Sequence, residues 1–178
     1  MVSQASELAV LVARLADALR ARGALLVTAE SCTGGLIAGA CTDLAGASDW
    51  FEHGIVSYSN RAKTELLGVP AALITNEGAV SEAVARAMAM GALRQSHAQC
   101  ALAVTGVAGP GGGSADKPVG TVWLAWAWCD ATGAEQVDAR LQHFGGDRTA
   151  VRQATILAAL QGLIERLPPD AGHAKGQD

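Results

Sequence analysis

The sequence has few of the residues that mark metal-binding, disulfide-linked or membrane-spanning proteins. Its four cysteines and four histidines form no CxxC pair and no pair at metal-ligand spacing, so we expect neither a metal site nor a disulfide framework. No apolar run reaches the roughly 20 residues that a membrane-spanning helix requires. The sequence therefore predicts no membrane partner, and the thiols are expected to be reduced and mostly buried.

Positive charge is also scarce. Thirteen basic residues stand against 17 acidic ones, which gives a formal net charge of −4 at pH 7. Because proteins that bind nucleic acid usually present a basic face, no nucleic-acid partner is expected, and an anionic ligand would need a local cluster of donors. The first residues lack the basic start and apolar block of a secretion signal, so a cytoplasmic protein is expected.

The remaining composition is typical of one globular domain. Half of the 178 residues are hydrophobic and 17% are charged, which excludes a disordered chain. A chain of this length can bury a continuous core, and no internal repeat or linker divides it. We expect one domain over residues 1–167 and a flexible tail at 168–178, because Pro168 and Pro169 end the last helix.

Hydrophobic spacing predicts that helices and strands alternate along most of the chain. The last two strands are separated by the turn DATG and should form an antiparallel hairpin, whereas residues 69–74 leave helix and strand both open. The pattern predicts an α/β fold, a single three-layer α/β/α domain with a mixed sheet. The expected helices are 3–22, 33–44, 61–67, 81–95 and one capped by Asp147, and the expected strands are 24–28, 54–58, 100–105, 119–128 and 135–144.

The turn AESCTGG, residues 29–35, joins an apolar strand to a helix and is the most informative stretch of the chain. Such a junction leaves backbone N–H groups unpaired and has a positive partial charge. Gly34 and Gly35 allow a ligand to approach the backbone, and the Ser31 hydroxyl lies beside donors that stabilise an oxyanion. The turn is therefore a candidate anion site with Ser31 as nucleophile, and a serine that only caps the helix is the alternative. Cys32 is interpreted as a packing residue.

Three further loops follow predicted strands, at the end where ligands gather in open α/β sheets. They are 58–63 (YSNRAK), 105–114 (TGVAGPGGGS) and 144–148 (FGGDR). The middle loop lacks the Lys-Ser/Thr of a P-loop and the chain has no GxGxxG pattern, so neither ATP nor a dinucleotide cofactor is expected. Its backbone amides are candidate donors to a phosphate or an oxyanion, with a plain crossover loop as the alternative.

Lys63 and Tyr58 are candidate catalytic groups in the first of these loops. Asn60 is expected to cap a short helix, whose dipole disfavours a cation in the first turn and should lower the pKa of Lys63. A lysine with a lowered pKa suits a general base, and Tyr58, the single tyrosine, suits a proton relay. A solvated lysine paired with a carboxylate and a tyrosine that only packs are the alternatives.

Arg148 and Arg152 lie one turn apart at the start of the last predicted helix. A cation opposes the helix dipole at this end unless an anion lies nearby, so the pair indicates a bound phosphate. Pairing of Arg148 with a protein carboxylate is the alternative.

Six short motifs follow one another along the chain: ESCTGG (30–35), VSYSN (56–60) with Lys63, GAVS (78–81), TGVAGPGG (105–112), KPVGTV (117–122) and GDR (146–148). In this order they resemble the CinA C-terminal family, over about residues 8–167. The characterised activity of that family is nicotinamide mononucleotide deamidase. The resemblance implies hydrolysis of the carboxamide of nicotinamide mononucleotide to nicotinate mononucleotide and ammonia, in pyridine nucleotide salvage.

The resemblance also implies a homodimer or higher homo-oligomer, in the form that lacks the additional N-terminal domain of some relatives. No cofactor or metal is expected from the sequence. Amide hydrolysis requires a nucleophile, a base and oxyanion donors. Ser31 is expected to be the nucleophile, Lys63 the general base, and Tyr58 a proton relay or orienting donor. The expected substrate contacts are Glu30, Thr33, Gly34, Gly35, Asn60, Thr105, Gly106, Gly109, Gly111, Gly112 and Arg148, with Arg148 at the 5′-phosphate.

Two other functions remain open on the sequence. One is a non-catalytic nucleotide-binding or partner-docking module with the same pocket, and the other is a serine amidase for a different small amide. An ammonia assay without added metal separates the first from an enzyme, and a substrate panel separates the second. Which loop binds the phosphate and which the oxyanion also stays open.

Overall fold

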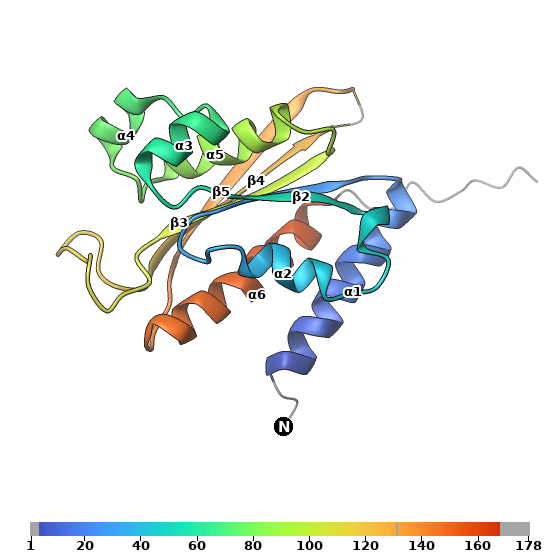
Figure 1. Cartoon of the computed structure of the whole chain (residues 1–178), viewed down its shortest axis with the longest axis horizontal. Helices are drawn as coiled ribbons and strands as arrows, with labels where there is room; N and C mark the ends of the chain where they lie inside the picture. Colours follow the sequence, from blue (N-terminus) through green and yellow to red (C-terminus); the bar gives the residue numbers. More distant parts are fainter. Residues whose placement is uncertain (1–3, 131, 168–178) are drawn as a thin grey trace, which may run out of the picture.

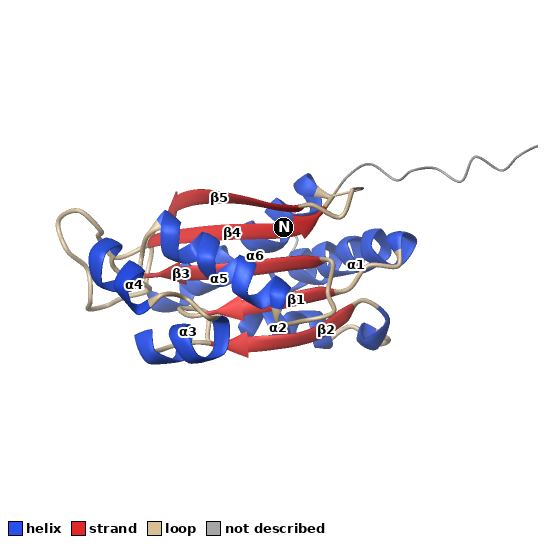
Figure 2. Ribbon diagram, turned by 90° about the horizontal axis from the view of Figure 1, so that it is seen from above, coloured by secondary structure: helices blue, strands red, loops and turns tan. Residues whose placement is uncertain are grey.

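The protein folds around a five-stranded sheet with helices on both faces (Figures 1 and 2). The structure is a computed structural model that describes residues 4–130 and 132–167. Its α/β fold with a mixed sheet confirms the predicted fold class. The elements are α1 (Gln4–Arg22), β1 (Leu26–Glu30), α2 (Leu36–Thr42), η1 (Ala47–Asp49), β2 (Phe51–Val56), α3 (Asn60–Leu67), α4 (Ala71–Glu77), α5 (Glu82–Arg94), β3 (Cys100–Gly106), β4 (Thr121–Cys129), β5 (Glu135–His143) and α6 (Arg148–Arg166).

The strand order is β2-β1-β3-β4-β5, with a parallel half and an antiparallel half (Figure 2). β1 pairs in parallel with β2 and β3, whereas β3, β4 and β5 pair antiparallel, so the predicted hairpin is confirmed. In the parallel half, Glu30 at the end of β1 aligns with Val56 of β2 and Val104 of β3. The loops that follow these three strands therefore leave the sheet at the same end, where the carboxyl ends of the strands lie.

Two apolar cores lie on opposite faces of the sheet. Helices α1, α2 and α6 cover one face, and α3, α4 and α5 cover the other (Figure 1). Along β1 the side chains alternate, because Leu26 belongs to the first core while Val27 and Ala29 belong to the second. Both faces of the central strands are therefore buried, which explains their nearly continuous apolar sequence.

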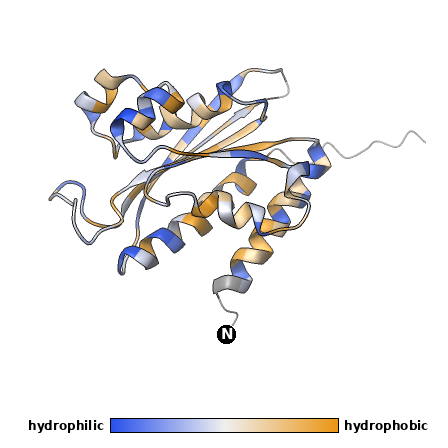
Figure 3. Ribbon diagram, in the orientation of Figure 1, coloured by the Kyte–Doolittle hydropathy of each residue, from blue (hydrophilic) through white to orange (hydrophobic). Residues whose placement is uncertain are grey.

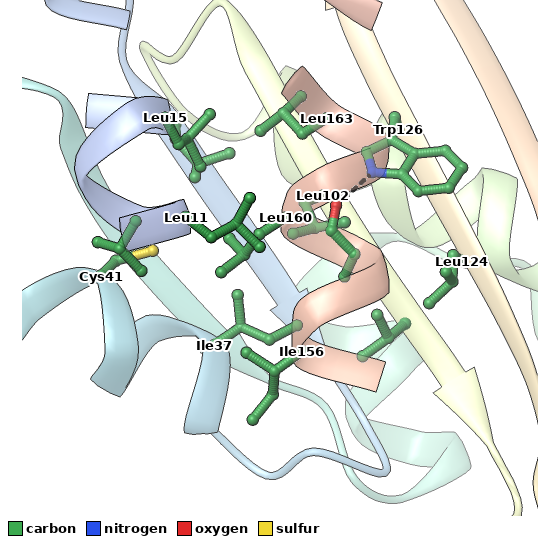
Figure 4. Packing of buried hydrophobic residues seen from close by; sticks show 14 of the residues in the cluster. Leu11, Leu15, Ile37, Cys41, Leu102, Leu124, Trp126, Ile156, Leu160 and Leu163 are labelled. Carbon is green, nitrogen blue, oxygen red and sulfur yellow. Dashed lines mark hydrogen bonds between the residues drawn. The ribbon is translucent and has the colours of Figure 1, made fainter. Parts of the chain in front are cut away.

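Trp126 of β4 shows how closely α6 packs on the sheet (Figure 4). Its indole N–H donates to the Ala159 carbonyl at 2.9 Å, and a Cβ at Gly162 would lie 2.1 Å from its ring. Only glycine fits at that position without a shift of the ring or the helix. The hydrophobic part of α6 packs in this core, and the helix begins with hydrophilic residues at its other end (Figure 3).

Most element boundaries agree with the predictions to within a few residues, and three differences affect the site. β1 extends through Glu30, so Ser31 follows the strand directly, and α2 begins only at Leu36 rather than at residue 33. The cap of α3 is Ser59, whose hydroxyl accepts from the Ala62 amide, rather than the predicted Asn60.

Elsewhere the structure decides what the sequence left open. Residues 71–77 form the helix α4, where the sequence allowed helix or strand, and the short η1 was not predicted. The predicted cap of α6 is confirmed, because the Asp147 carboxylate accepts from the Ala150 amide. Among the described helices, none is both long and apolar enough to cross a membrane. The predicted tail, residues 168–178, lies outside the described residues.

Candidate active site

A cavity of about 200 Å³ lies where the loops after β1, β2 and β3 meet the beginning of α6. Seven of the predicted site residues line it, which are Ser31, Tyr58, Asn60, Lys63, Thr105, Gly106 and Arg148. Cys32, Ala79, Val80 and Ala108 complete its wall. The topology thus brings together residues from five separate parts of the chain.

Lys63 and Ser31 make the closest side-chain contact in this cavity. The Lys63 ammonium nitrogen lies 2.9 Å from the Ser31 hydroxyl oxygen, although 32 residues separate them in sequence. Lys63 is 1% exposed and Ser31 is 8% exposed, so bulk water is nearly excluded from the pair. A hydroxyl and an amine at this distance can exchange a proton directly.

The surroundings of Lys63 favour an uncharged amine. Burial lowers the pKa of Lys63 from its ordinary value, with a smaller opposing effect from Cys32. The predicted direction of the shift is therefore confirmed, but its main cause is burial rather than the dipole of α3. The other two contacts of the Lys63 nitrogen are the carbonyl oxygens of Ser57, at 2.8 Å, and Tyr58, at 3.5 Å.

A neutral amine has two N–H donors and one lone pair. If the two donors face the carbonyls of Ser57 and Tyr58, the lone pair of Lys63 faces the Ser31 hydroxyl. This is the orientation that a general base requires. The backbone after β2 therefore determines which way the nitrogen of Lys63 points.

Glu30 has a different role from the substrate contact that we predicted. Its carboxylate is buried and accepts hydrogen bonds from the amides of Gly35 and Ile37, both at 3.0 Å, and Ala38 at 2.8 Å. It thus occupies the N-terminus of α2 as an internal anion. The interpretation of this helix end as a substrate anion site is wrong, because its donors are already bound within the chain.

Two of the four amides from Ser31 to Gly34 donate to backbone carbonyls. Ser31 N–H donates to the Val104 carbonyl, and Gly34 N–H donates to the Ser31 carbonyl, both at 3.1 Å. The amides of Cys32 and Thr33 donate to no other residue within 4–130 and 132–167. Cys32 also lines the cavity, next to Ser31 in the chain. Burial raises the pKa of the Cys32 thiol to about 11, as expected for a packing residue.

Tyr58 and Arg148 meet at the mouth of the cavity. Arg148 donates to the Tyr58 phenol oxygen at 3.1 Å and to the Gly109 carbonyl at 2.9 Å. The Tyr58 side chain is 60% exposed, and its backbone carbonyl, not its phenol, contacts Lys63. The phenol therefore orients Arg148 in this structure. Arg148 forms no ion pair with any carboxylate in the described part of the chain.

The glycine loop after β3 reaches the cavity only with its first residues. Gly106 and Ala108 line it, whereas Gly111 and Gly112 do not. The Thr105 hydroxyl donates to the Ala79 carbonyl at 2.8 Å, which ties the end of β3 to the segment before α5. Gly109 contributes its carbonyl to Arg148.

Three predicted contacts in the nucleophile turn, Thr33, Gly34 and Gly35, do not line the cavity. Thr33 is fully buried and its carbonyl accepts from Arg152 at 2.8 Å. Gly34 and Gly35 have φ values of +60° and +95°, which explains why both positions need glycine. These residues shape the turn rather than the cavity surface.

The cysteines are reduced, and three of the four are buried. Cys32, Cys41 and Cys100 are buried as expected, while Cys129 is exposed. Within the described residues, no three His, Cys, Asp or Glu side chains gather in a group that could hold a metal ion.

Comparison with known proteins identifies the family. The sequence model of the family described as CinA C-terminal domain matches residues 8–167. The chain belongs to the CinA C-terminal domain family. The resemblance drawn from the six motifs is therefore confirmed, and the family match includes every residue that lines the cavity.

Relatives of similar length bear the name nicotinamide-nucleotide amidohydrolase PncC. The protein from Escherichia coli K12 is 49% identical over 161 residues, which are 90% of this chain and 95% of the relative. The one from Pseudomonas putida is 52% identical over 155 residues, 87% of this chain and 94% of the relative. A CinA-like protein from Geotalea daltonii is 56% identical over 86% of this chain, but the match spans only 36% of that longer protein.

Solved CinA-family structures have the same fold. The competence/damage inducible protein CihA from Agrobacterium tumefaciens superposes with a TM-score of 0.84 at 46% identity, over 89% of this chain and 94% of that one. A CinA superfamily protein from Klebsiella pneumoniae gives a TM-score of 0.84 at 39% identity, over 90% of this chain and 97% of that one.

Proposed function

We propose that this CinA-family protein hydrolyses the carboxamide of nicotinamide mononucleotide to nicotinate mononucleotide and ammonia, in pyridine nucleotide salvage. The observation that carries the proposal is the buried contact of 2.9 Å between the Lys63 nitrogen and the Ser31 hydroxyl. The names of the relatives that match most of this chain supply the substrate. The catalytic domain corresponds to residues 1–167.

In the acylation step, the Ser31 oxygen attacks the carboxamide carbon and its proton passes to the Lys63 nitrogen. The carbonyl oxygen becomes an oxyanion, for which we assign the Cys32 amide as donor. As the carbon–nitrogen bond breaks, Lys63 returns the proton to the leaving nitrogen. Ammonia departs and an ester of Ser31 with nicotinate mononucleotide remains.

Deacylation repeats the sequence with water as nucleophile. Lys63 accepts a proton from the water as its oxygen attacks the ester carbon. Collapse of the second tetrahedral intermediate breaks the bond to Ser31, and Lys63 returns the proton to the serine oxygen. Nicotinate mononucleotide leaves with the new carboxylate.

Arg148 is the group we assign to the 5′-phosphate. Two of its N–H groups are used by Tyr58 and Gly109, and a guanidinium has five, so donors remain for an anion at the cavity. Tyr58 then orients Arg148. Asn60 and Gly106 also line the cavity and are assigned to the rest of the nucleotide.

The test measures ammonia and nicotinate mononucleotide after pure protein is mixed with nicotinamide mononucleotide in the absence of added metal. The wild type should release both products in equal amounts, and Ser31→Ala should release neither while still binding the mononucleotide. Ser96→Ala, a serine outside the cavity, is the matched control. Binding without product from the wild type would instead support a non-catalytic module. Turnover of other amides alone would support a different amidase.

The proposal also includes a cytoplasmic homodimer or higher homo-oligomer without cofactor. Light scattering of the protein as it elutes from a size-exclusion column measures its mass in solution. A mass of a single chain would remove this part of the proposal and leave the chemistry untouched.

A further inference from the structure

Arg152 lies one helical turn after Arg148 but has a different neighbour. Its guanidinium donates to the Thr33 carbonyl at 2.8 Å, which joins α6 to the turn that follows Ser31. Its Nε atom is buried and has no partner among the described residues. Arg148 lines the cavity, whereas Arg152 does not. The positive charge of Arg152 is thus directed at a peptide group behind the nucleophile.

A series of peptide groups leads from Arg152 to the cavity. The Thr33 carbonyl belongs to the same peptide as the Gly34 N–H, and this N–H donates to the Ser31 carbonyl at 3.1 Å. The Ser31 carbonyl in turn belongs to the same peptide as the Cys32 N–H. Hydrogen bonds in series polarise one another, and a charged donor at one end strengthens the chain.

The series ends at the Cys32 N–H. The Cys32 amide donates to no other described residue, and Cys32 lines the cavity next to Ser31. The neighbouring amides of Gly35, Ile37 and Ala38 are bound by Glu30. These three amides at the end of α2 are therefore not available to a negative charge that develops on a substrate oxygen near Ser31.

We propose that Arg152 is a positioning residue, which orients and polarises the Cys32 N–H through the Thr33–Gly34 and Ser31–Cys32 peptides as an oxyanion donor. The inference rests on the proposed attack by Ser31. Arg152 touches no substrate in this role. The two arginines at the start of α6 consequently have different roles: Arg148 binds the substrate anion, and Arg152 stabilises the transition state through the Cys32 N–H.

Kinetics of three variants separate this role from simple binding. Arg152→Met retains most of the apolar stem but no donor, and it should lower kcat about 10- to 100-fold with KM within about twofold of wild type, because removal of one oxyanion donor costs about 10²–10³. Arg152→Lys keeps a cation and should recover part of kcat. Arg148→Met should mainly raise KM, and Gln153→Ala on the exposed side of α6 should behave as wild type.

A second measurement does not depend on the substrate. Phenylmethylsulfonyl fluoride modifies reactive serines: the Ser31 oxygen bonds to sulfur, fluoride leaves, and the serine proton passes to Lys63. Intact-mass analysis should show slower modification of Arg152→Met than of Gln153→Ala, since charge also develops on a sulfonyl oxygen. Circular dichroism checks that each variant is folded. If Arg152→Met does not fold, the rates of Arg152→Lys are compared with those of Gln153→Ala instead.

Each outcome is decisive. A wild type that releases no ammonia contradicts the proposed function, while the labelling rates still test Arg152. If the Arg152 variants match Gln153→Ala in both assays, Arg152 has no role beyond packing. A rise in KM alone, as expected for Arg148→Met, would make Arg152 a second substrate ligand and overturn the inference.

Discussion

The two halves of the sheet use charged side chains in opposite ways. Along the hairpin β4–β5, arginines pair with carboxylates at the surface, as in Arg94–Glu135 and Arg140–Glu165. At the ends of the parallel strands, Glu30 and Lys63 are buried, and their partners are peptide groups and the Ser31 hydroxyl. Ionisable side chains thus lie at the surface in one half and are buried around the Ser31 turn in the other.

The difference follows from how well each side chain and its partners are solvated when their contact is lost. An exposed ion pair gains little, because water solvates both partners well when they separate. A buried charge whose partners are peptide groups is held in one geometry, and its loss leaves those groups unpaired. Substitutions in the parallel half should therefore have large effects, and those along the hairpin small ones.

The largest effect is expected from Lys63→Met, which fills the buried volume without a base. The kcat for ammonia release should fall by about 10²–10⁴, the usual contribution of a positioned base. Stopped assays with the purified variant measure it, with Lys117→Met as the control at a lysine that contacts Glu77 instead of the cavity. A variant within threefold of wild type would assign the base elsewhere.

The pH dependence of the rate tests the same residue. Lys63 must lose its proton to accept one from Ser31, so kcat/KM should rise with pH and level off above the pKa of Lys63. Because burial lowers this pKa, the midpoint should lie below 10.5, the ordinary value for lysine. Lys63→Arg, which stays protonated, should show no such rise. A rate that falls as pH increases through this range would contradict a neutral lysine.

A smaller effect is expected from Glu30→Gln, and it concerns stability first. The neutral amide cannot accept from all three amides at the start of α2, and a buried donor left unpaired costs about 1–3 kcal/mol. Urea unfolding at neutral pH measures the loss, with Glu82→Gln in the exposed pair with Arg86 as the control. Equal midpoints for both variants would show that Glu30 does not hold the turn.

The smallest effect is expected from Arg94→Gln on the hairpin side. Its partner Glu135 is solvated at the sheet edge, so neither the urea midpoint nor kcat should differ measurably from wild type. A clear loss of activity from this substitution would break the contrast between the two halves of the sheet.

The strands and helices were predictable because their signals are local. Hydrophobic periodicity marked α1 and α6, an alanine-rich stretch marked α5, and the turn DATG marked the hairpin. The boundaries of β1 and α2 were shifted, because Gly34 and Gly35 have positive φ and lie outside the helix, and the Glu30 carboxylate binds the amides at its start. That interaction links Glu30 to amides five to eight residues further on, and no periodic pattern records it.

The membership of the cavity was partly predictable. Ser31, Lys63 and Arg148 could be named from residue types at strand ends and from the family motifs, whereas the roles of Glu30 and Arg152 could not. Arg152 resembles Arg148 in sequence position, and only the geometry of α6 against the Ser31 turn distinguishes them. Likewise, only the geometry shows that Thr33 and Gly35 belong to the turn and do not line the cavity.

The sequence by itself determined the family, the alternation of elements and the chemical groups available for a reaction. The tertiary structure decided which of those groups meet, and in which direction burial shifts the pKa of Lys63. Parallel pairing of β1 with β2 puts Ser31 and the loop of Lys63 at one sheet edge, and packing there removes water from the amine. Proximity across 32 residues and the loss of solvent are properties of the folded chain, because neither exists until the strands pair.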